Sequence, residues 1–335
     1  MDIEDYEPIG TITELSERIA AAAGLSANIE RVTIEDRFGG NGPLMAGALG
    51  RLGLPVTYVG AVGDGAIHPT FTQFASRCER VCPIGPHSHT VCLEFEDGKV
   101  MMNDTRAVQA ITWERLIERV TLAEFTRFID RARLLGIVNW SLMGGVPGIW
   151  RGIIRDVLPH ISHADRRLFI DLSDPAKRTD ADIGGMLAML GDIERAGLRV
   201  SLGLNLSEAT RISQVLGCVP PRAGQSEAIR AAAAAIRERV CIDTVVVHPR
   251  EGAACAAREG APAWFDGPFT SDPKLSTGAG DHFNAGFAFA QGLGLEAAEC
   301  LATGCAVSGA YVRDAESPTL QRVVAFLADL PAPDR

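Results

Sequence analysis

Residues 276–287 constrain what this chain can fold into more than any other segment. They read Ser-Thr-Gly-Ala-Gly-Asp-His-Phe-Asn-Ala-Gly-Phe, a glycine turn that opens an apolar helix. The first N–H groups of a helix have no internal partners, and the helix dipole places about half a positive charge there. Gly278 and Gly280 let the backbone approach an anion without a Cβ in the way. The segment therefore predicts an anion site with the Asp281 carboxylate beside it.

Two interpretations of Asp281 follow from the residues alone. Beside a phosphate, its carboxylate can take a proton from an attacking hydroxyl. Alternatively, Asp281 only caps the helix and the glycines only turn the chain. The segment lacks the third glycine of the dinucleotide fingerprint, and Gly98-Lys99 is followed by Val, so the chain has no P-loop.

Strands and helices alternate through the middle of the chain. Apolar runs predict strands, and helical spacing predicts helices between them. The expected strands are 134–140, 168–172, 200–206 and 244–248, and the expected helices are 149–158, 182–196, 227–239, 283–293 and 296–312. This alternation predicts a parallel sheet covered by helices on both faces.

The N-terminal third has a different pattern. Residues 11–23 and 44–52 predict helices, 31–34 and 56–62 predict strands, and 38–42 form a glycine loop. Residues 90–102 read as a β-hairpin with an Asp-Gly turn. Because a hairpin does not fit the alternation of strand and helix, we expect it to form a separate small β element attached to one domain.

Composition excludes several classes of partner. The chain carries a net charge of −10, whereas nucleic acids and anionic membranes require a basic face. No apolar run approaches the roughly 18 residues of a membrane span, and the acidic start at residues 1–5 is not a secretion signal. The eight cysteines contain no Cys-x-x-Cys pair, so we expect reduced thiols in a soluble, cytoplasmic protein.

Four motifs together resemble the PfkB/ribokinase family of carbohydrate kinases. Thr277-Gly278-Ala279-Gly280-Asp281, with the helix after it, resembles the C-terminal signature of the family. The other three, in family order, are Gly39-Gly40-Asn41 with residues 49–53 and 59–64, then Asp171-Leu172-Ser173-Asp174-Pro175, then Asn205-Leu206-Ser207-Glu208. The resemblance covers roughly residues 38–313.

The resemblance implies a fold and a reaction. The fold is α/β and ribokinase-like, a central, mostly parallel sheet flanked by helices on both faces, with a small β-sheet lid. One domain would span residues 1–335, with lid elements at about 28–38 and 88–104. The reaction is transfer of the ATP γ-phosphoryl group to a hydroxyl of a sugar or polyol, which requires mainly positioning and charge stabilisation.

The resemblance also assigns roles to residues. Asp281 would be the general base, and the N–H groups of Gly278, Ala279 and Gly280 would form the anion hole. Asn205 and Glu208 would hold Mg²⁺ through water, or only form a strand end and a helix cap. The nucleotide site would consist of Asn205, Glu208, Thr277, His248 and Gly252, and the sugar would contact Gly39, Gly40 and Asn41.

Several positions depart from the family pattern. The hydrophobic first strand that ends in a sugar-binding Asp has no counterpart before Arg31, and Leu44 replaces a sugar-binding Asn. Leu275 stands where an Asp is common, which argues against the family's monovalent-cation site. His248 could donate to a phosphate or simply end a strand. His282 replaces a small residue, and packing beneath the site is its favoured interpretation.

Alternatives to a sugar kinase remain at this point. A nucleoside kinase of the same fold would need an aromatic base pocket, for which Phe38 and Tyr58 are candidates. A nucleotide-binding regulator without turnover would explain Leu44 but not the presence of Asp281 in its glycine turn. The small-molecule substrate would be the main partner, and open lid edges predict a homodimer in which the lids pair.

Overall fold

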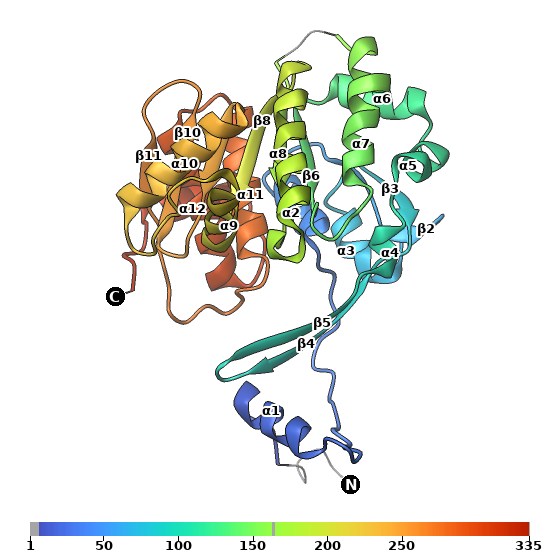
Figure 1. Cartoon of the computed structure of the whole chain (residues 1–335), viewed down its shortest axis with the longest axis vertical. Helices are drawn as coiled ribbons and strands as arrows, with labels where there is room; N and C mark the ends of the chain where they lie inside the picture. Colours follow the sequence, from blue (N-terminus) through green and yellow to red (C-terminus); the bar gives the residue numbers. More distant parts are fainter. Residues whose placement is uncertain (1–6, 163–164, 335) are drawn as a thin grey trace.

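A six-stranded sheet forms the centre of the molecule (Figure 1). The computed structural model describes residues 7–162 and 165–334. The strand order is β11-β10-β9-β8-β7-β6, with β6 to β9 parallel and β10 and β11 antiparallel. The strands are β6 (Leu134–Val138), β7 (Arg167–Asp171), β8 (Arg199–Leu204), β9 (Thr244–Val247), β10 (Gly252–Ala257) and β11 (Ala263–Asp266). The expected mostly parallel sheet is confirmed, and β10 and β11 extend it by two strands that the sequence did not predict.

Helices cover both faces of this sheet, as predicted. Successive side chains of a strand point to opposite faces. Leu168 and Ile170 therefore pack with α7 to α10, whereas Phe169 between them packs with α2, α11 and α12. The helices are α2 (Asn41–Arg51), α7 (Val146–Gly152), α8 (Asp180–Arg195), α9 (Leu206–Leu216), α10 (Ser226–Val240), α11 (Ala279–Gly292), α12 (Ala297–Asp314) and α13 (Leu320–Ala328).

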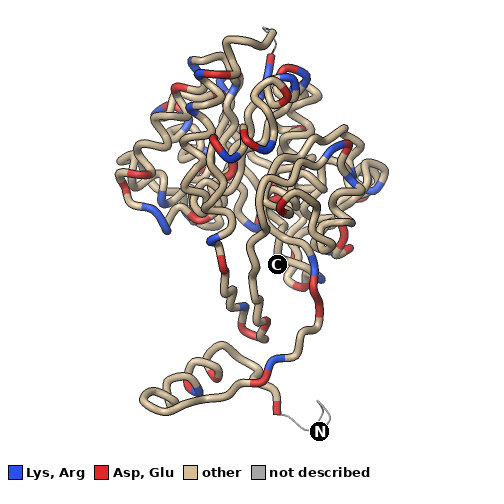
Figure 2. The backbone as a smooth tube through the Cα atoms, turned by 90° about the vertical axis from the view of Figure 1, so that its right-hand side faces the viewer, with Lys and Arg blue, Asp and Glu red and all other residues tan. Residues whose placement is uncertain are grey.

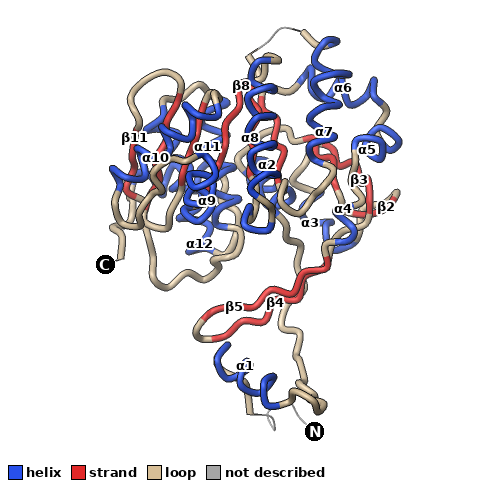
Figure 3. The backbone as a smooth tube through the Cα atoms, in the orientation of Figure 1, coloured by secondary structure: helices blue, strands red, loops and turns tan. Residues whose placement is uncertain are grey.

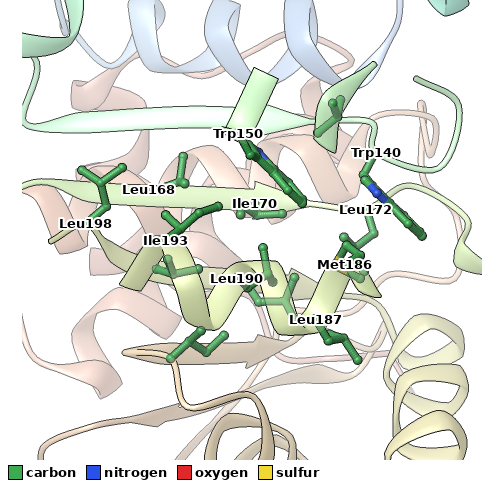
Figure 4. Packing of buried hydrophobic residues seen from close by; sticks show 14 of the residues in the cluster. Trp140, Trp150, Leu168, Ile170, Leu172, Met186, Leu187, Leu190, Ile193 and Leu198 are labelled. Carbon is green, nitrogen blue, oxygen red and sulfur yellow. The ribbon is translucent and has the colours of Figure 1, made fainter. Parts of the chain in front are cut away.

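The α8 side of the sheet holds the larger hydrophobic cluster (Figure 4). Leu168 and Ile170 of β7 face Leu190 and Ile193 of α8, and all four are fully buried or nearly so. The Thr179 side chain accepts the Asp182 N–H, and the Asp182 side chain accepts the Thr179 N–H, which completes a capping box at the start of α8. The capping box therefore fixes the start of α8, and its buried apolar residues fix the face that packs on the sheet.

The chain between α2 and β6 includes a second, smaller sheet and several short helices (Figure 3). Its strand order is β1-β3-β2. The elements are β1 (Thr57–Gly60), β2 (Gly63–Asp64), α3 (Thr72–Ala75), β3 (Arg80–Gly85), α4 (Arg106–Gln109), α5 (Trp113–Arg119) and α6 (Leu122–Arg131). The sequence predicted β1 but not β3, α5 or α6.

The expected hairpin is confirmed as β4 (His89–Phe95) paired with β5 (Gly98–Asp104). It projects from the body together with α1 (Ile12–Ala21) and the extended segment that follows α1 (Figures 1 and 2). The Ile12 N–H donates to Asp97 Oδ1 at 2.8 Å, and the Glu96 N–H donates to Gly10 O at 3.0 Å. These bonds attach α1 to the turn of the hairpin.

The expected strand at residues 31–34 is wrong. Residues 25–40 carry no strand, and the side chains of Val32 and Ile34 are 53% and 96% exposed. A β-strand needs a neighbour to satisfy its N–H and C=O groups, and the described part of this chain places none beside this segment. The β-branched composition therefore predicted the extended backbone correctly but not its pairing.

Positively and negatively charged residues are both distributed along the whole fold (Figure 2). Among the described residues, no helix is both long enough and apolar enough to cross a bilayer.

Candidate active site

The glycine turn and Asp281 lie where α11 begins, near the carboxyl end of β7. Gly278 caps α11 with a φ of 91°, a left-handed conformation that glycine adopts without strain. A Cβ on Gly278 would also come within 3.0 Å of Leu44 Cδ1 and 3.1 Å of the Tyr311 hydroxyl. The expected turn into a helix is thus confirmed, and its first position has room only for glycine.

Two of the three expected anion-hole amides have no internal acceptor. Among the described residues, the N–H groups of Gly278 and Gly280 donate to no backbone or side-chain oxygen. The Ala279 N–H instead donates to Ser276 O at 3.3 Å. The turn therefore offers the Gly278 and Gly280 amides, at the positive end of the α11 dipole, to an anion.

Asp281 is half-buried in the first turn of α11. Burial and the negative charge of Asp171 raise the pKa of its carboxyl to about 8, although the Asn41 side chain and its own backbone N–H oppose the shift. A pKa close to the working pH suits a general base, because part of the carboxylate is then deprotonated and able to take a proton.

Asp171, which ends β7, links three elements of the site. Its Oδ2 accepts from Asn284 Nδ2 of α11 at 2.7 Å, and its Oδ1 accepts from the Ser173 N–H at 2.9 Å. Asn41 Nδ2, at the start of α2, lies 3.5 Å from Oδ1. Burial raises the pKa of Asp171, and the hydrogen bonds from Ser173 and Asn284 oppose the shift.

A cluster of small polar side chains lines the cleft beside Asp171. The Ser173 hydroxyl lies 3.1 Å from Asn41 Oδ1 and 2.9 Å from Asn139 Oδ1. Asn139 and Ser173 have positive φ values of 70° and 65°, a conformation that costs energy in non-glycine residues and concentrates at functional sites. The cleft that these residues line also borders Thr90 and Asn103 of the hairpin. Such groups can bind sugar hydroxyls, which both donate and accept.

Asn205 and Glu208 form the capping box of α9. The Asn205 N–H donates to Glu208 Oε2 at 2.8 Å, and the Glu208 N–H donates to Asn205 Oδ1 at 3.0 Å. The helix-cap interpretation is therefore confirmed. Glu208 is also buried, and its pKa is raised by burial and by the charges of Asp171, Asp174 and Asp281. The pair thus caps a helix and also places a carboxylate near the anion site.

This convergence of carboxylates fits a divalent cation. Asp171, Asp281 and Glu208 repel one another in a low-dielectric site, and a cation between them would relieve that repulsion. In residues 7–162 and 165–334, no group of three or more His, Cys, Asp or Glu side chains could hold a metal directly. An ion bound through water and through substrate phosphates suits Mg²⁺, which keeps several of its waters.

His248 lies beside the turn at Gly280, whereas Gly252 is the first residue of β10. The His248 ring packs on Phe283 with centroids 4.6 Å apart, and its Cε1 lies 3.4 Å from where a Cβ of Gly280 would be. Burial lowers the pKa of His248 to about 4, and its buried Nε2 has no partner among the described residues. At Gly252, a Cβ would come within 2.4 Å of Phe265 O of β11. The close approach of the neighbouring strand β11 is therefore sufficient to explain why position 252 is a glycine.

The structure brings Lys99 to the turn, which the sequence did not predict. Its ammonium group, at the turn of the hairpin, donates to Thr277 Oγ1 and, at 3.2 Å, to Ser276 Oγ. Asn139, Asp171, Ser173 and Asn284 were also missed as site residues. Asp171 and Ser173 lie in the Asp-Pro motif and Asn284 lies within residues 276–287, whereas Asn139 lies in no motif. Gly39, Gly40 and Asn41 border the cleft, next to Leu44.

Comparisons with known proteins find relatives that match almost the whole chain. A family model for prokaryotic ketohexokinase matches residues 1–330. A ketohexokinase of Haloferax volcanii is 29% identical over 325 residues, which cover 96% of this chain and 84% of that protein.

Solved structures of low sequence identity share the fold. A ribokinase from Cryptococcus neoformans in complex with ADP aligns with a TM-score of 0.66 at 18% identity, covering 89% of this chain and 91% of its own. An Escherichia coli protein provisionally named ribokinase II, in complex with ATP and Mg²⁺, aligns with a TM-score of 0.62 at 13% identity, covering 91% and 95%. The predicted ribokinase-like α/β fold with a separate small β element is confirmed.

Proposed function

The chain belongs to the prokaryotic ketohexokinase family of sugar kinases, and we propose that it transfers the γ-phosphoryl group of ATP to a hydroxyl of a ketohexose, with Asp281 as the general base. The observation that carries this proposal is the position of Asp281, with a pKa of about 8, in the helix turn that presents the Gly278 and Gly280 amides.

The chemistry follows from these groups. Asp281 takes the proton of the acceptor hydroxyl, and the oxygen forms a bond to the γ-phosphorus as the bond to the ADP oxygen breaks. The Gly278 and Gly280 amides stabilise the charge on the transferring phosphoryl oxygens. When bound, Mg²⁺ neutralises the phosphate charge, and Asn205 and Glu208 would hold it through water.

The sugar would lie in the cleft beside Asp171. Asn41, Asn139 and Ser173 offer donors and acceptors for its hydroxyls, and the backbone of Gly39 and Gly40 would allow close approach. Leu44 would contribute an apolar contact, whereas the resemblance to PfkB/ribokinase kinases implies a hydrogen-bonding Asn at this position. His248, beside Gly280, would face the nucleotide phosphates together with Thr277 and Gly252.

The hairpin would serve as a lid over the sugar, with the segment near residues 28–38 as its second part. The contact of Lys99 with Ser276 and Thr277 supports closure of residues 88–104 over the glycine turn. Among the described residues, no third strand pairs with the two-stranded hairpin, and Met101 and Met102 of β5 are exposed, as is Ile34 of the segment after α1. Because unpaired strand edges pair readily, the lid supports a homodimer through this face.

A nucleoside kinase is less well supported. The rings of Phe38 and Tyr58 pack on Phe74 at centroid distances of 5.9 and 4.9 Å. They belong to a hydrophobic cluster with Phe71, so packing in this cluster is enough to explain the presence of both aromatic rings. No described feature of the cleft favours a base over a sugar.

The test is an ADP-release assay with Mg-ATP and a panel of ketohexoses, aldohexoses, pentoses and nucleosides. The proposal predicts release with a ketohexose that exceeds release with every nucleoside. Release only with a nucleoside, or with no acceptor in the panel, would reject the substrate assignment.

A further inference from the structure

Three consecutive carbonyl groups of the glycine turn accept hydrogen bonds from side chains behind it. The Tyr311 hydroxyl donates to Thr277 O at 2.7 Å, and the Ser308 hydroxyl donates to Ala279 O at 2.9 Å. Between them, His282 Nδ1 lies 2.8 Å from Gly278 O. Tyr311 and Ser308 lie one turn apart on α12, which packs along α11. The rear of the turn is thus fixed at successive peptide groups.

Because the peptide group is planar, a bond that fixes one of these carbonyl groups also fixes the direction of the next residue's N–H group. In a trans peptide, the carbonyl of one residue and the N–H of the next point in opposite directions. A bond that holds Thr277 O toward Tyr311 therefore directs the Gly278 N–H away from it. In the same way, Ser308 holds Ala279 O and directs the Gly280 N–H. These are the two amides of the turn without an internal acceptor.

His282 holds the third peptide group and the Tyr311 ring. Its ring stacks on Tyr311 with centroids 3.5 Å apart and an angle of 12°. Because a carbonyl only accepts, Nδ1 carries the proton, and Nε2 accepts from the Ser317 hydroxyl at 2.9 Å. Arg77 Nη1 in turn donates to Ser317 Oγ at 3.2 Å. His282 is completely buried, and burial lowers its pKa to about 4, so it stays neutral near pH 7.

We propose that Tyr311 and Ser308 are positioning residues, which orient the Gly278 and Gly280 amides toward the transferring phosphoryl group. Both hydroxyls bond to carbonyl groups of the turn and would act through the amides on its other side. Glycine at these positions leaves the two peptide planes free to rotate, and preorganised donors stabilise a transition state without reorganising. The hydroxyls of α12 supply the restraint that the glycines lack. The proposal rests on the proposed phosphoryl transfer.

The variants that test this remove one hydroxyl each. Tyr311→Phe keeps the ring on His282, and Ser308→Ala leaves only a small cavity. The matched control is Ser201→Ala, because the buried Ser201 hydroxyl donates to Gln291 Oε1 at 2.9 Å near the far end of α11. Thermal unfolding identifies any variant that fails to fold.

The expected result is a fall in kcat of about 10-fold for Tyr311→Phe and for Ser308→Ala, with the KM for sugar within about twofold of wild type. Losing a donor outright costs about 10²–10³ in kcat, and misorienting one should cost less. Inhibition by ADP with aluminium fluoride, a mimic of the transferring phosphoryl group, should weaken by a similar factor, whereas the Kd for ADP alone should not change.

Three outcomes overturn the proposal. One is a kcat within twofold of that of Ser201→Ala in both variants. Another is an equal loss of affinity for ADP alone and for ADP with aluminium fluoride, which would mean a general structural role. The third is a fall in kcat that only accompanies lost thermal stability. An inactive wild-type protein would instead reject the proposed function itself, so the two failures are distinguishable.

Discussion

Asn284 donates from its Nδ2 to Asp171 Oδ2 at 2.7 Å across 113 positions of sequence. Asn284 lies one turn after Asp281 on α11, so the bond holds the end of β7 against the helix that carries the proposed base. Asp171 is consequently close enough for its charge to raise the pKa of Asp281. The basicity of Asp281 is therefore set in part by a residue of another motif.

This relationship predicts a pH dependence. Because the pKa of Asp281 is about 8, its charged, basic form is lost as the pH falls below 8. The kcat/KM for sugar, measured at saturating ATP, should fall about tenfold per unit on the acidic side of that value. Asp171→Asn removes the neighbouring charge, so the acidic limb should move to lower pH, by an amount of the order of one unit. A limb that stays in place would contradict the coupling of these two residues.

Glu208→Gln tests the magnesium assignment. The Gln Oε1 can still accept the Asn205 N–H, so the cap of α9 should survive while the charge is lost. Outer-sphere ligands of a metal typically contribute 10–100-fold to its affinity, and we expect the Mg²⁺ concentration for half-maximal rate to rise at least tenfold. Asp182→Asn is the matched control, since Asp182 holds the same place in the capping box of α8. Equal Mg²⁺ requirements in both variants would limit Glu208 to a capping role.

Lys99→Met tests the lid. The ammonium group bridges the hairpin to Ser276 and Thr277 through exposed hydrogen bonds, and such bonds contribute about 0.5–1 kcal/mol. The KM for sugar should therefore rise about two- to fivefold, with a smaller change in kcat. Lys274→Met, an equal loss of charge outside the hairpin, should leave both constants unchanged. The lid assignment fails if the two variants behave alike.

Ile34→Glu tests the homodimer. Light scattering of the wild-type protein should give twice the chain mass of 35.7 kDa. Ile34 is 96% exposed in the single chain. A charge there should therefore leave the stability of a monomer unchanged but should weaken a lid-to-lid interface. Val219→Glu is the control, because Val219 is 79% exposed on the body. A wild-type monomer at high concentration would rule out the dimer.

The sequence predicted those parts of the site that depend on local structure. The glycine turn, Asp281 and the Asn205–Glu208 cap each lie within a short segment, where helix-end chemistry determines the conformation. The parallel sheet followed from the alternation of strand and helix. The unpaired segment at residues 31–34 was mispredicted, because β-branched side chains favour extended backbone but do not supply a neighbouring strand.

The remaining site residues depend on tertiary contacts that no spacing encodes. Ser173 bonds to both Asn41 and Asn139 only because β6 and β7 end close to where α2 begins. Lys99 reaches the turn only through the fold of the hairpin. His282 was expected to pack beneath the site, and the structure confirms this. Its hydrogen bond to Gly278 O and its stacking on Tyr311 could not be inferred without α12 in place.

The most direct test of the account is the rate of ADP release by Asp281→Asn beside the wild-type protein, at saturating Mg-ATP and ketohexose. The substitution keeps the shape of the side chain and removes the base. The account predicts that the variant folds and binds ATP with unchanged affinity, yet loses turnover by about 10²–10⁴. Turnover equal to that of the wild type would contradict the central claim that Asp281 takes the proton of the acceptor hydroxyl.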